Sequence, residues 1–147
     1  MSFKTDLLSL YIPMDFLSYL TMFQLTVKKI IEIQTKIIDT SIIIGDEGTG
    51  GLVRDFGTLE YIVNNQDYYH SPIENSAWIL LSISSMHPFY QGNKRTALES
   101  SQMLLFFNNN GSIISGNPEE TNEYIRKIAI GIFEIEEIIN WINTHLS

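Results

Sequence analysis

The chain has 147 residues, the length of a single compact domain with one hydrophobic core. Its formal net charge is −8, and this acidic balance argues against direct binding of nucleic acid, which needs a surplus of Lys and Arg at the phosphates. The absence of cysteine excludes disulfides, thiolate catalysis and Cys-ligated metals, and it favours a cytoplasmic location. No apolar run approaches the roughly 20 residues of a membrane span, so we expect no membrane contact.

Helical spacing of apolar residues dominates the sequence and predicts an all-α fold of about six helices. Thr26 is a candidate N-cap for the first clear helix, whose apolar pattern fades at Asp39–Thr40. Four glycines between residues 45 and 51 then predict a flexible connection. The segment 51–60 is short and flanked by glycine, which favours a loop or short hairpin over a helix.

The strongest helix signal begins at Ser71, a candidate N-cap followed by proline, with Glu74 three residues later to complete a capping box. The body of this helix, residues 77–83, is apolar on nearly all faces, as expected of a helix buried in the middle of a bundle. We expect it to end near Met86 or His87, because the proline that follows disfavours helical backbone at the residue before it.

Three further helices complete the predicted bundle. A loop after the buried helix leads into a helical run over about residues 93–107, which a cluster of asparagines ends. The pair Asn117–Pro118, followed by two glutamates, is a second start signal of the capped type. Isoleucines from Ile135 to Ile142 form the core face of the last helix.

The one part of the chain dense in reactive side chains reads His-Pro-Phe-Tyr-Gln-Gly-Asn-Lys-Arg, from His87 to Arg95. His87 stands at the end of the buried helix, while Gly92 and Asn93 begin a helix whose first free N–H groups can bind an anion. Lys94 adds positive charge in the same turn. A histidine beside an anion site suits phosphoryl or nucleotidyl transfer. The spacing leaves open a structural alternative, in which His87 is a helix C-cap and the basic residues are solvated surface charges.

The order His-Pro-Phe-x-x-Gly-Asn-Lys-Arg-Thr-Ala over 87–97 resembles the signature of the Fic/Doc (Fido) family, most closely its Doc, or death-on-curing, branch. Upstream, residues 51–60 are similar to the family stretch Gly-x-x-Arg-Asp-x-Gly-x-Leu-Glu. The resemblance covers about residues 25–146. It implies a Fido-type helical bundle with a central buried helix over 25–147, preceded by an N-terminal helical extension over 1–24.

The resemblance implies chemical roles for five residues of the motif. His87 would be the general base that takes a proton from a target hydroxyl. Gly92 and Asn93 would hold phosphate oxygens through backbone and side-chain donors. Lys94 and Arg95 would neutralise the nucleotide phosphates and take part in catalysis.

Other matched residues would support the site rather than react. Phe89 would anchor the motif in the core. Gly51, Arg54, Asp55 and Gly57 would belong to a flap, against which an extended segment of the target protein docks by strand addition.

Two positions favour the Doc branch. Adenylyl-transferring members carry Gly where this chain has Lys94, and a second Arg where it has Leu98. Similarity to Doc implies a toxin of a toxin–antitoxin pair that uses ATP to phosphorylate a threonine of a target protein such as translation elongation factor Tu. A Fic-type adenylyltransferase, which transfers AMP to protein, is the alternative.

Gln91 departs from the family pattern, which has Asp or Glu at this position to hold Mg²⁺. An amide oxygen can ligate magnesium but lacks the charge that makes carboxylates the usual ligand. Asp46, Glu47 and Asp55 are acidic residues that could compensate, although a solvated surface role is favoured for each. A catalytically impaired Fido scaffold, which binds nucleotide or a partner without turnover, is therefore a third alternative.

The sequence has no match to the inhibitory helix Ser/Thr-x-x-x-Glu-Gly/Asn that restrains some family members. Restraint would then come from a separate antitoxin protein or from the N-terminal extension. The apolar residues between Leu7 and Phe23 leave two alternatives open. They pack on the domain, or they present a face to an antitoxin or to a second copy of the chain, which would give a homodimer.

Overall fold

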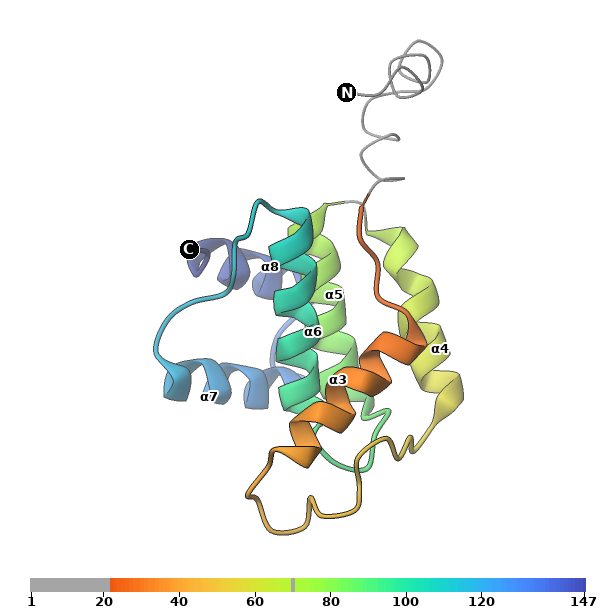
Figure 1. Ribbon diagram of the computed structural model, residues 1–147. Coiled ribbons are helices and arrows are strands. Elements are labelled where there is room, and N and C mark those ends of the chain that lie inside the picture. The colour runs from red at the N-terminus through yellow and green to blue at the C-terminus, as the bar shows by residue number, and fades with distance from the viewer. Residues whose placement is uncertain (1–21, 70) are drawn as a thin grey trace, which may run out of the picture.

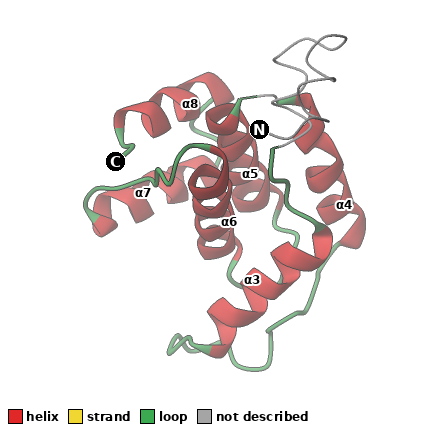
Figure 2. Ribbon diagram, turned by 45° about the horizontal axis from the view of Figure 1, so that its top comes forward, coloured by secondary structure: helices red, strands yellow, loops and turns green. Residues whose placement is uncertain are grey.

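The computed structural model describes residues 22–69 and 71–147, which fold into a bundle of α-helices (Figures 1 and 2). The predicted all-α fold is confirmed, since this part of the chain contains six α-helices, one 3₁₀ turn and no strand. The elements in chain order are α3 (Val27–Asp39), α4 (Phe56–Asn64), η1 (Asn65–Tyr68), α5 (Pro72–Met86), α6 (Asn93–Asn108), α7 (Pro118–Ala129) and α8 (Ile135–Thr144).

Side-chain caps begin three of these helices at the residues that the sequence predicts. The Thr26 hydroxyl accepts a hydrogen bond from the Lys29 N–H at 3.0 Å. The Ser71 hydroxyl accepts one from the Glu74 N–H at 3.0 Å. Asn117 accepts from two N–H groups in the first turn of α7. Each cap satisfies donors that the start of a helix leaves unpaired, which is why these local signals locate the helix ends well.

Helix α5 is the centre of the bundle and packs against α4, α6, α7 and α8 (Figure 1). Most of its side chains are buried, including Ala77, Leu80 and Ile83, because the segment is apolar on nearly all faces. Ser76 and Ser101 fasten α5 to α6, since each hydroxyl donates to the other residue's backbone carbonyl, at 2.9 and 3.0 Å. These two helices therefore hold the ends of the loop that carries the reactive segment.

The expected loop or short hairpin over 51–60 is wrong from Phe56 onward, because α4 begins there. The Asp55 side chain caps this helix by accepting from an N–H of its first turn at 3.1 Å. The cap and the burial of two apolar side chains of α4 outweigh the glycine in its first turn. Only the preceding residues are extended, with a single antiparallel bridge between Val53 and Phe89.

The predicted N-terminal extension lies outside the described residues, apart from positions 22–24. Where the described chain begins, the side-chain amide of Asn108 holds the backbone of Phe23, accepting from its N–H at 2.7 Å and donating to its carbonyl at 2.8 Å. The role of the extension in packing or dimerisation stays a prediction. Within residues 22–69 and 71–147, no helix combines the length and the hydropathy needed to cross a lipid bilayer.

Candidate functional site

The candidate site is built on residues 87–92, which link α5 to α6 and are called the motif loop below (Figure 1). Helix α5 ends at Met86, as predicted, and His87 caps it with left-handed backbone angles, φ 53° and ψ 61°. This conformation is uncommon for residues other than glycine, and it turns the chain sharply out of the helix. The His87 side chain is exposed, so its imidazole is accessible to another molecule.

Arg54 supports His87 from the neighbouring extended segment. Its Nε donates to the His87 carbonyl at 2.7 Å, and its Nη2 donates to the Met86 carbonyl at 3.0 Å. The Arg54 backbone N–H also donates to the Pro88 carbonyl at 2.7 Å. Carbonyls at the end of a helix lack intrahelical donors and carry partial negative charge, so a guanidinium is favourable there. Arg54, expected in the docking flap, therefore holds the motif loop in place.

Replacing Arg54 by Lys is expected to loosen the motif loop and to leave the bundle folded. Lysine keeps the charge but cannot donate to two carbonyls with the planar geometry of a guanidinium. Because Arg54 is exposed, we expect a loss of only about 1 kcal/mol in the free energy of unfolding, measured with urea. Amide hydrogen exchange should be faster over 87–92, whereas Arg126→Lys on the surface of α7 should not change it. Unchanged exchange in the Arg54 variant would contradict the supporting role.

Phe89 and Asn93 close the motif loop on itself. The Phe89 side chain is buried in the core, with 1% of its surface exposed. Asn93 accepts from the Phe89 N–H at 2.9 Å and donates to the Phe89 carbonyl at 2.8 Å. The side chain of Asn93, expected as a phosphate donor, is thus engaged with the loop. Its backbone N–H, in the first turn of α6, is the donor it offers to an anion.

The N-terminus of α6 is the part of the site suited to bind an anion. Its N-cap, Gly92, has φ 79° and makes no side-chain cap, which leaves N–H groups of the first turn for a ligand. A Cβ at Gly92 would lie 3.2 Å from Cδ1 of Ile38, and the left-handed backbone would strain another residue. Lys94 is exposed in the same turn and adds a full positive charge.

A cavity of about 260 Å³ adjoins this terminus. Residues 91–95 line it, so the structure brings the four predicted phosphate ligands together around one space. Leu98 continues the wall along α6, and Asn122 and Ile125 complete it from α7. The two α7 residues were missed by sequence reasoning, because nothing local indicates which helix packs opposite the motif.

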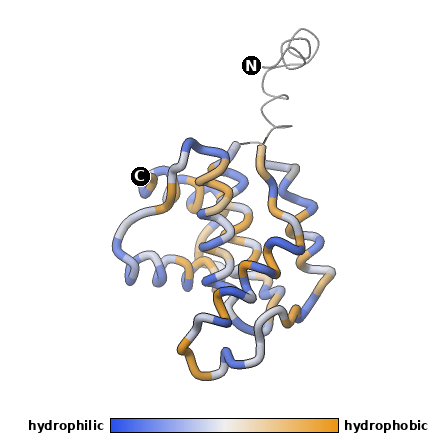
Figure 3. Tube along the Cα trace, viewed as in Figure 1, coloured by the Kyte–Doolittle hydropathy of each residue, from blue (hydrophilic) through white to orange (hydrophobic). Residues whose placement is uncertain are grey.

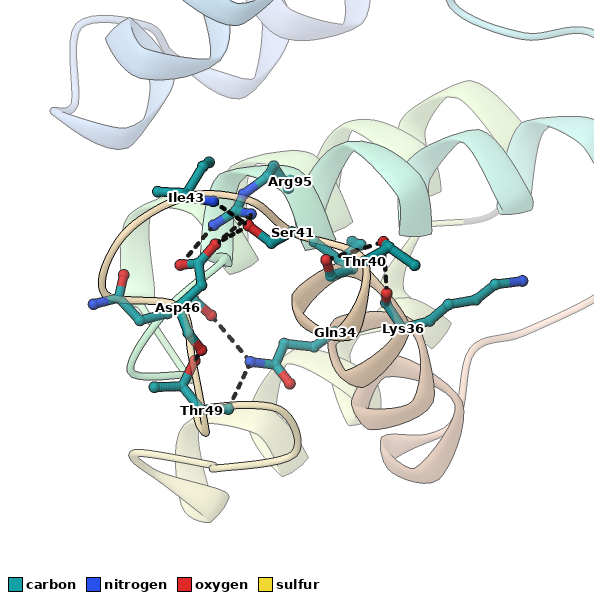
Figure 4. A network of polar contacts seen from close by, with 10 residues as sticks. Gln34, Lys36, Thr40, Ser41, Ile43, Asp46, Thr49 and Arg95 are labelled. Atoms are coloured by element: carbon teal, nitrogen blue, oxygen red, sulfur yellow. Dashed lines mark hydrogen bonds and ion pairs between the residues drawn. The ribbon is translucent and has the colours of Figure 1, made fainter.

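Arg95 is engaged by an acidic residue from the loop after α3 (Figure 4). Its Nη1 donates to Asp46 Oδ2 at 2.8 Å, and its Nη2 donates to Asp46 Oδ1 at 3.2 Å. The hydrogen bonds from Arg95 and then from Ser41 lower the pKa of the Asp46 carboxyl below its ordinary value, so it stays charged. The expected surface role of Asp46 is wrong, since only 2% of the residue is exposed.

Gln34 of α3 joins that loop to the motif loop, and sequence reasoning missed it as well. It is fully buried, and its Nε2 donates to the carbonyls of Thr49 and Gln91, at 3.2 and 3.1 Å. Its Oε1 accepts from the Gly51 N–H at 2.7 Å. A polar side chain inside an apolar helix pattern is the available signal, but its partners lie 15 to 57 residues away in sequence.

The residues predicted to form the docking flap lie in two different places, the segment before α4 and the start of α4 itself. Gly51 ends the loop after α3 with φ 78°, and Arg54 contacts the motif loop. Asp55 caps α4, and Gly57 lies in its first turn, so Gly57 is not part of an extended flap. The extended part is the short stretch that contains Val53, and a docking role for it stays a prediction.

The residues around the motif loop do not form a Mg²⁺ site by themselves. The predicted ligand Gln91 is a neutral, exposed amide. The acidic residues that could compensate for Gln91 have other contacts or are exposed. Asp46 binds Arg95, Asp55 caps α4, and Glu47 is exposed. Among the residues that the structure describes, no three His, Asp or Glu side chains are grouped to hold a metal ion.

The fold and the site together define an all-α domain with a Fido-type motif loop. The family model of the Fic/DOC family matches residues 24–105, more than half of the chain, and the chain belongs to this family. The match includes both the 51–60 stretch and the motif at 87–97. No curated protein matches the chain. Members of the family are typically transferases that modify proteins, which supports this function for the chain in general terms.

Proposed function

We propose that the chain is a Doc-type toxin kinase of the cytoplasm, which transfers the γ-phosphate of ATP to a threonine hydroxyl of a target protein such as elongation factor Tu. The observation that carries the proposal is the pairing of an exposed His87 with the uncapped N-terminus of α6 across one short loop. The first supplies a proton acceptor and the second supplies donors for a phosphoryl group, which are the two requirements of the reaction.

Lys94 and Leu98 favour phosphate transfer over AMP transfer. Lys94 concentrates positive charge at the first turn of α6, beside the N–H groups that bind a phosphoryl group. Leu98, one turn further, lines the same cavity with an apolar side chain, where adenylyl-transferring relatives have arginine. The cation that would hold the nucleotide in the orientation for AMP transfer is therefore missing from the α6 wall.

In the proposed reaction, the target hydroxyl oxygen forms a bond to the γ-phosphorus of ATP. The bond from that phosphorus to the bridging oxygen breaks, and ADP leaves. His87 accepts the hydroxyl proton, while Lys94 and the first N–H groups of α6 stabilise charge on the transferred group. Arg54 and Phe89 act on His87 only through the motif loop, one by its carbonyl contacts and the other by burial.

The proposal is tested with ATP that carries label on either the α or the γ phosphate. Purified chain and Mg²⁺ are incubated with elongation factor Tu, and separately with a cell lysate. Label on protein from the γ position alone is the expected result. Label from the α position would contradict the kinase proposal and support transfer of AMP.

Gln91 favours a second candidate function, a Fido scaffold that binds nucleotide with little turnover, because a neutral amide attracts Mg²⁺ weakly. Replacing Gln91 by Asp is then expected to lower the Mg²⁺ concentration for half-maximal transfer by about tenfold, since it restores a charged oxygen ligand. The matched control is Asn143→Asp, which adds the same charge on exposed α8 surface. If both variants lower this Mg²⁺ concentration equally, or neither lowers it, Gln91 does not limit Mg²⁺-dependent transfer.

Two partners belong to the proposed function besides the target protein. A separate antitoxin would restrain the toxin, because the sequence lacks the inhibitory helix of other members. The extension at 1–24 is the proposed contact for that antitoxin or for a second copy of the chain.

A further inference from the structure

The first part of the connection between α3 and α4, residues 40–51 and called the Asp46 loop below, reaches α6 at the candidate site (Figure 4). Asp46 binds both terminal nitrogens of Arg95, at 2.8 and 3.2 Å. The Ser41 hydroxyl donates to Asp46 at 2.5 Å and accepts from Arg95 at 3.3 Å. One acidic side chain of the loop therefore occupies the arginine that the motif offers to an anion.

The burial pattern of the Asp46 loop is the reverse of what solvation favours. Asp46 is 2% exposed, while Ile42 and Ile44 are each 98% exposed. Figure 3 shows the hydrophobic stretch in this loop after α3. A carboxylate out of water is stable only when it is paired and hydrogen-bonded, so Arg95 and Ser41 are what keep Asp46 in place.

Arg95 also belongs to the wall of the cavity at the N-terminus of α6. Arg95 lines that cavity together with Lys94, and its side chain is 36% exposed. A carboxylate and a phosphate compete for one guanidinium because both bind it through the same paired donors. As long as Asp46 neutralises Arg95, an anionic ligand at α6 meets one full positive charge fewer.

The Asp46 loop is fastened to the rest of the domain at two places. Its end is held by buried Gln34, which bonds the Thr49 carbonyl and the Gly51 N–H. Its middle is held to α6 by Asp46, between Gly45 and Gly48. Both glycines have positive φ, and a Cβ at either would meet no atom within 4 Å. The middle can therefore leave α6 while Gln34 keeps the end in place.

We propose that the Asp46 loop is a latch on the anion site: with Asp46 bound to Arg95 the site is closed to nucleotide phosphates, and a phosphate that takes Arg95 releases the loop. This inference rests on the proposed nucleotide-dependent function. It adds an internal competitor for the phosphate, built into the domain itself and separate from any antitoxin.

The test measures binding of Mg²⁺–ATP to the full chain by isothermal titration calorimetry. Asp46→Asn is expected to tighten binding by about tenfold, a typical size for coupling between competing ligands. Glu47→Gln is the matched control, because it removes the same charge from the next residue, which is exposed. Its affinity is expected to stay within about twofold of the parent.

A second variant and a second readout keep the latch testable if Asp46→Asn does not fold. Ser41→Ala removes one hydrogen bond from Asp46 without a change of charge, and it should tighten ATP binding by a smaller factor. ATP should also raise amide hydrogen exchange over 42–48 of the parent chain. Binding that is unchanged or weaker in both variants, or exchange that does not rise, would overturn the latch and leave the proposed function standing. Absence of ATP binding in the parent and all variants would overturn both.

Discussion

Replacement of His87 by Asn is expected to reduce phosphate transfer by at least about 100-fold while the fold is retained. Asparagine tolerates the left-handed backbone that His87 adopts, with φ 53°, so the turn out of α5 is preserved. Its amide cannot accept a proton, so only the proposed chemistry is lost. The measurement is the initial rate of γ-label transfer to elongation factor Tu, with the melting temperature followed by circular dichroism.

Two companion variants separate a chemical role for His87 from a structural one. His87→Gly also permits the left-handed backbone and should lose as much activity as His87→Asn. His145→Asn removes an imidazole from the C-cap of α8, in a different part of the chain, and should retain activity. If His87→Asn keeps activity within about tenfold of the parent, His87 is not the general base.

The local signals of the sequence predict the helices well, because a capping side chain and the helix it starts are neighbours in the chain. Thr26, Ser71 and Asn117 each bond an N–H within three residues, and all three helices begin where predicted. The failure at 51–60 has the opposite cause. Gly51 and Gly57 indicate a loop locally, while Asp55 and the buried face of α4 decide the structure of this stretch.

In the candidate site, too, the sequence predicts contacts between neighbouring residues but not contacts between distant segments. The predicted phosphate ligands and His87 lie in one short stretch of sequence, so the motif alone predicts that they meet around one helix terminus. Residues 92–95 do line one cavity there, whereas His87 is not among the lining residues. What surrounds them comes from elsewhere: Asn122 from α7, Gln34 from α3 and Asp46 from a loop. Their contacts depend on how the helices pack, which no local pattern in the sequence records.

A further reason why the sequence does not predict these contacts is that side-chain amides form hydrogen bonds with much of the irregular backbone. The structure describes no strand in residues 22–69 and 71–147, so extended segments there need other partners for their N–H and carbonyl groups. In four cases one Asn or Gln amide bonds both backbone groups of a single residue. These pairs are Asn93 with Phe89, Asn108 with Phe23, Gln66 with Leu25 and Gln102 with Ile114. Asn and Gln are typical of solvent-exposed positions, so their sequence pattern does not reveal such contacts.

Replacement of Phe89 by Ala is expected to lower the free energy of unfolding by about 3–5 kcal/mol, the usual cost of deleting a buried phenyl ring. Phe89 is 1% exposed and belongs to the hydrophobic core, although it sits in the motif loop. The Asn93 side chain bonds only the backbone N–H and carbonyl of Phe89, a pair of contacts called the Asn93 clamp below. Phe89→Ala therefore keeps these two hydrogen bonds but loses the buried ring. Transfer activity should therefore fall together with stability, because His87 lies two residues away.

Denaturation with urea measures the loss, and two variants calibrate it. Phe89→Leu keeps most of the buried volume and should cost less than about 1.5 kcal/mol. Tyr90→Ala removes the next ring, which is 59% exposed, and should change stability by no more than about 0.5 kcal/mol. If the ring anchors the loop, the free energy of unfolding should rise from Phe89→Ala to Phe89→Leu to the parent. Equal stability of Phe89→Ala and Tyr90→Ala would show that the loop is held by the Asn93 clamp and Arg54 alone.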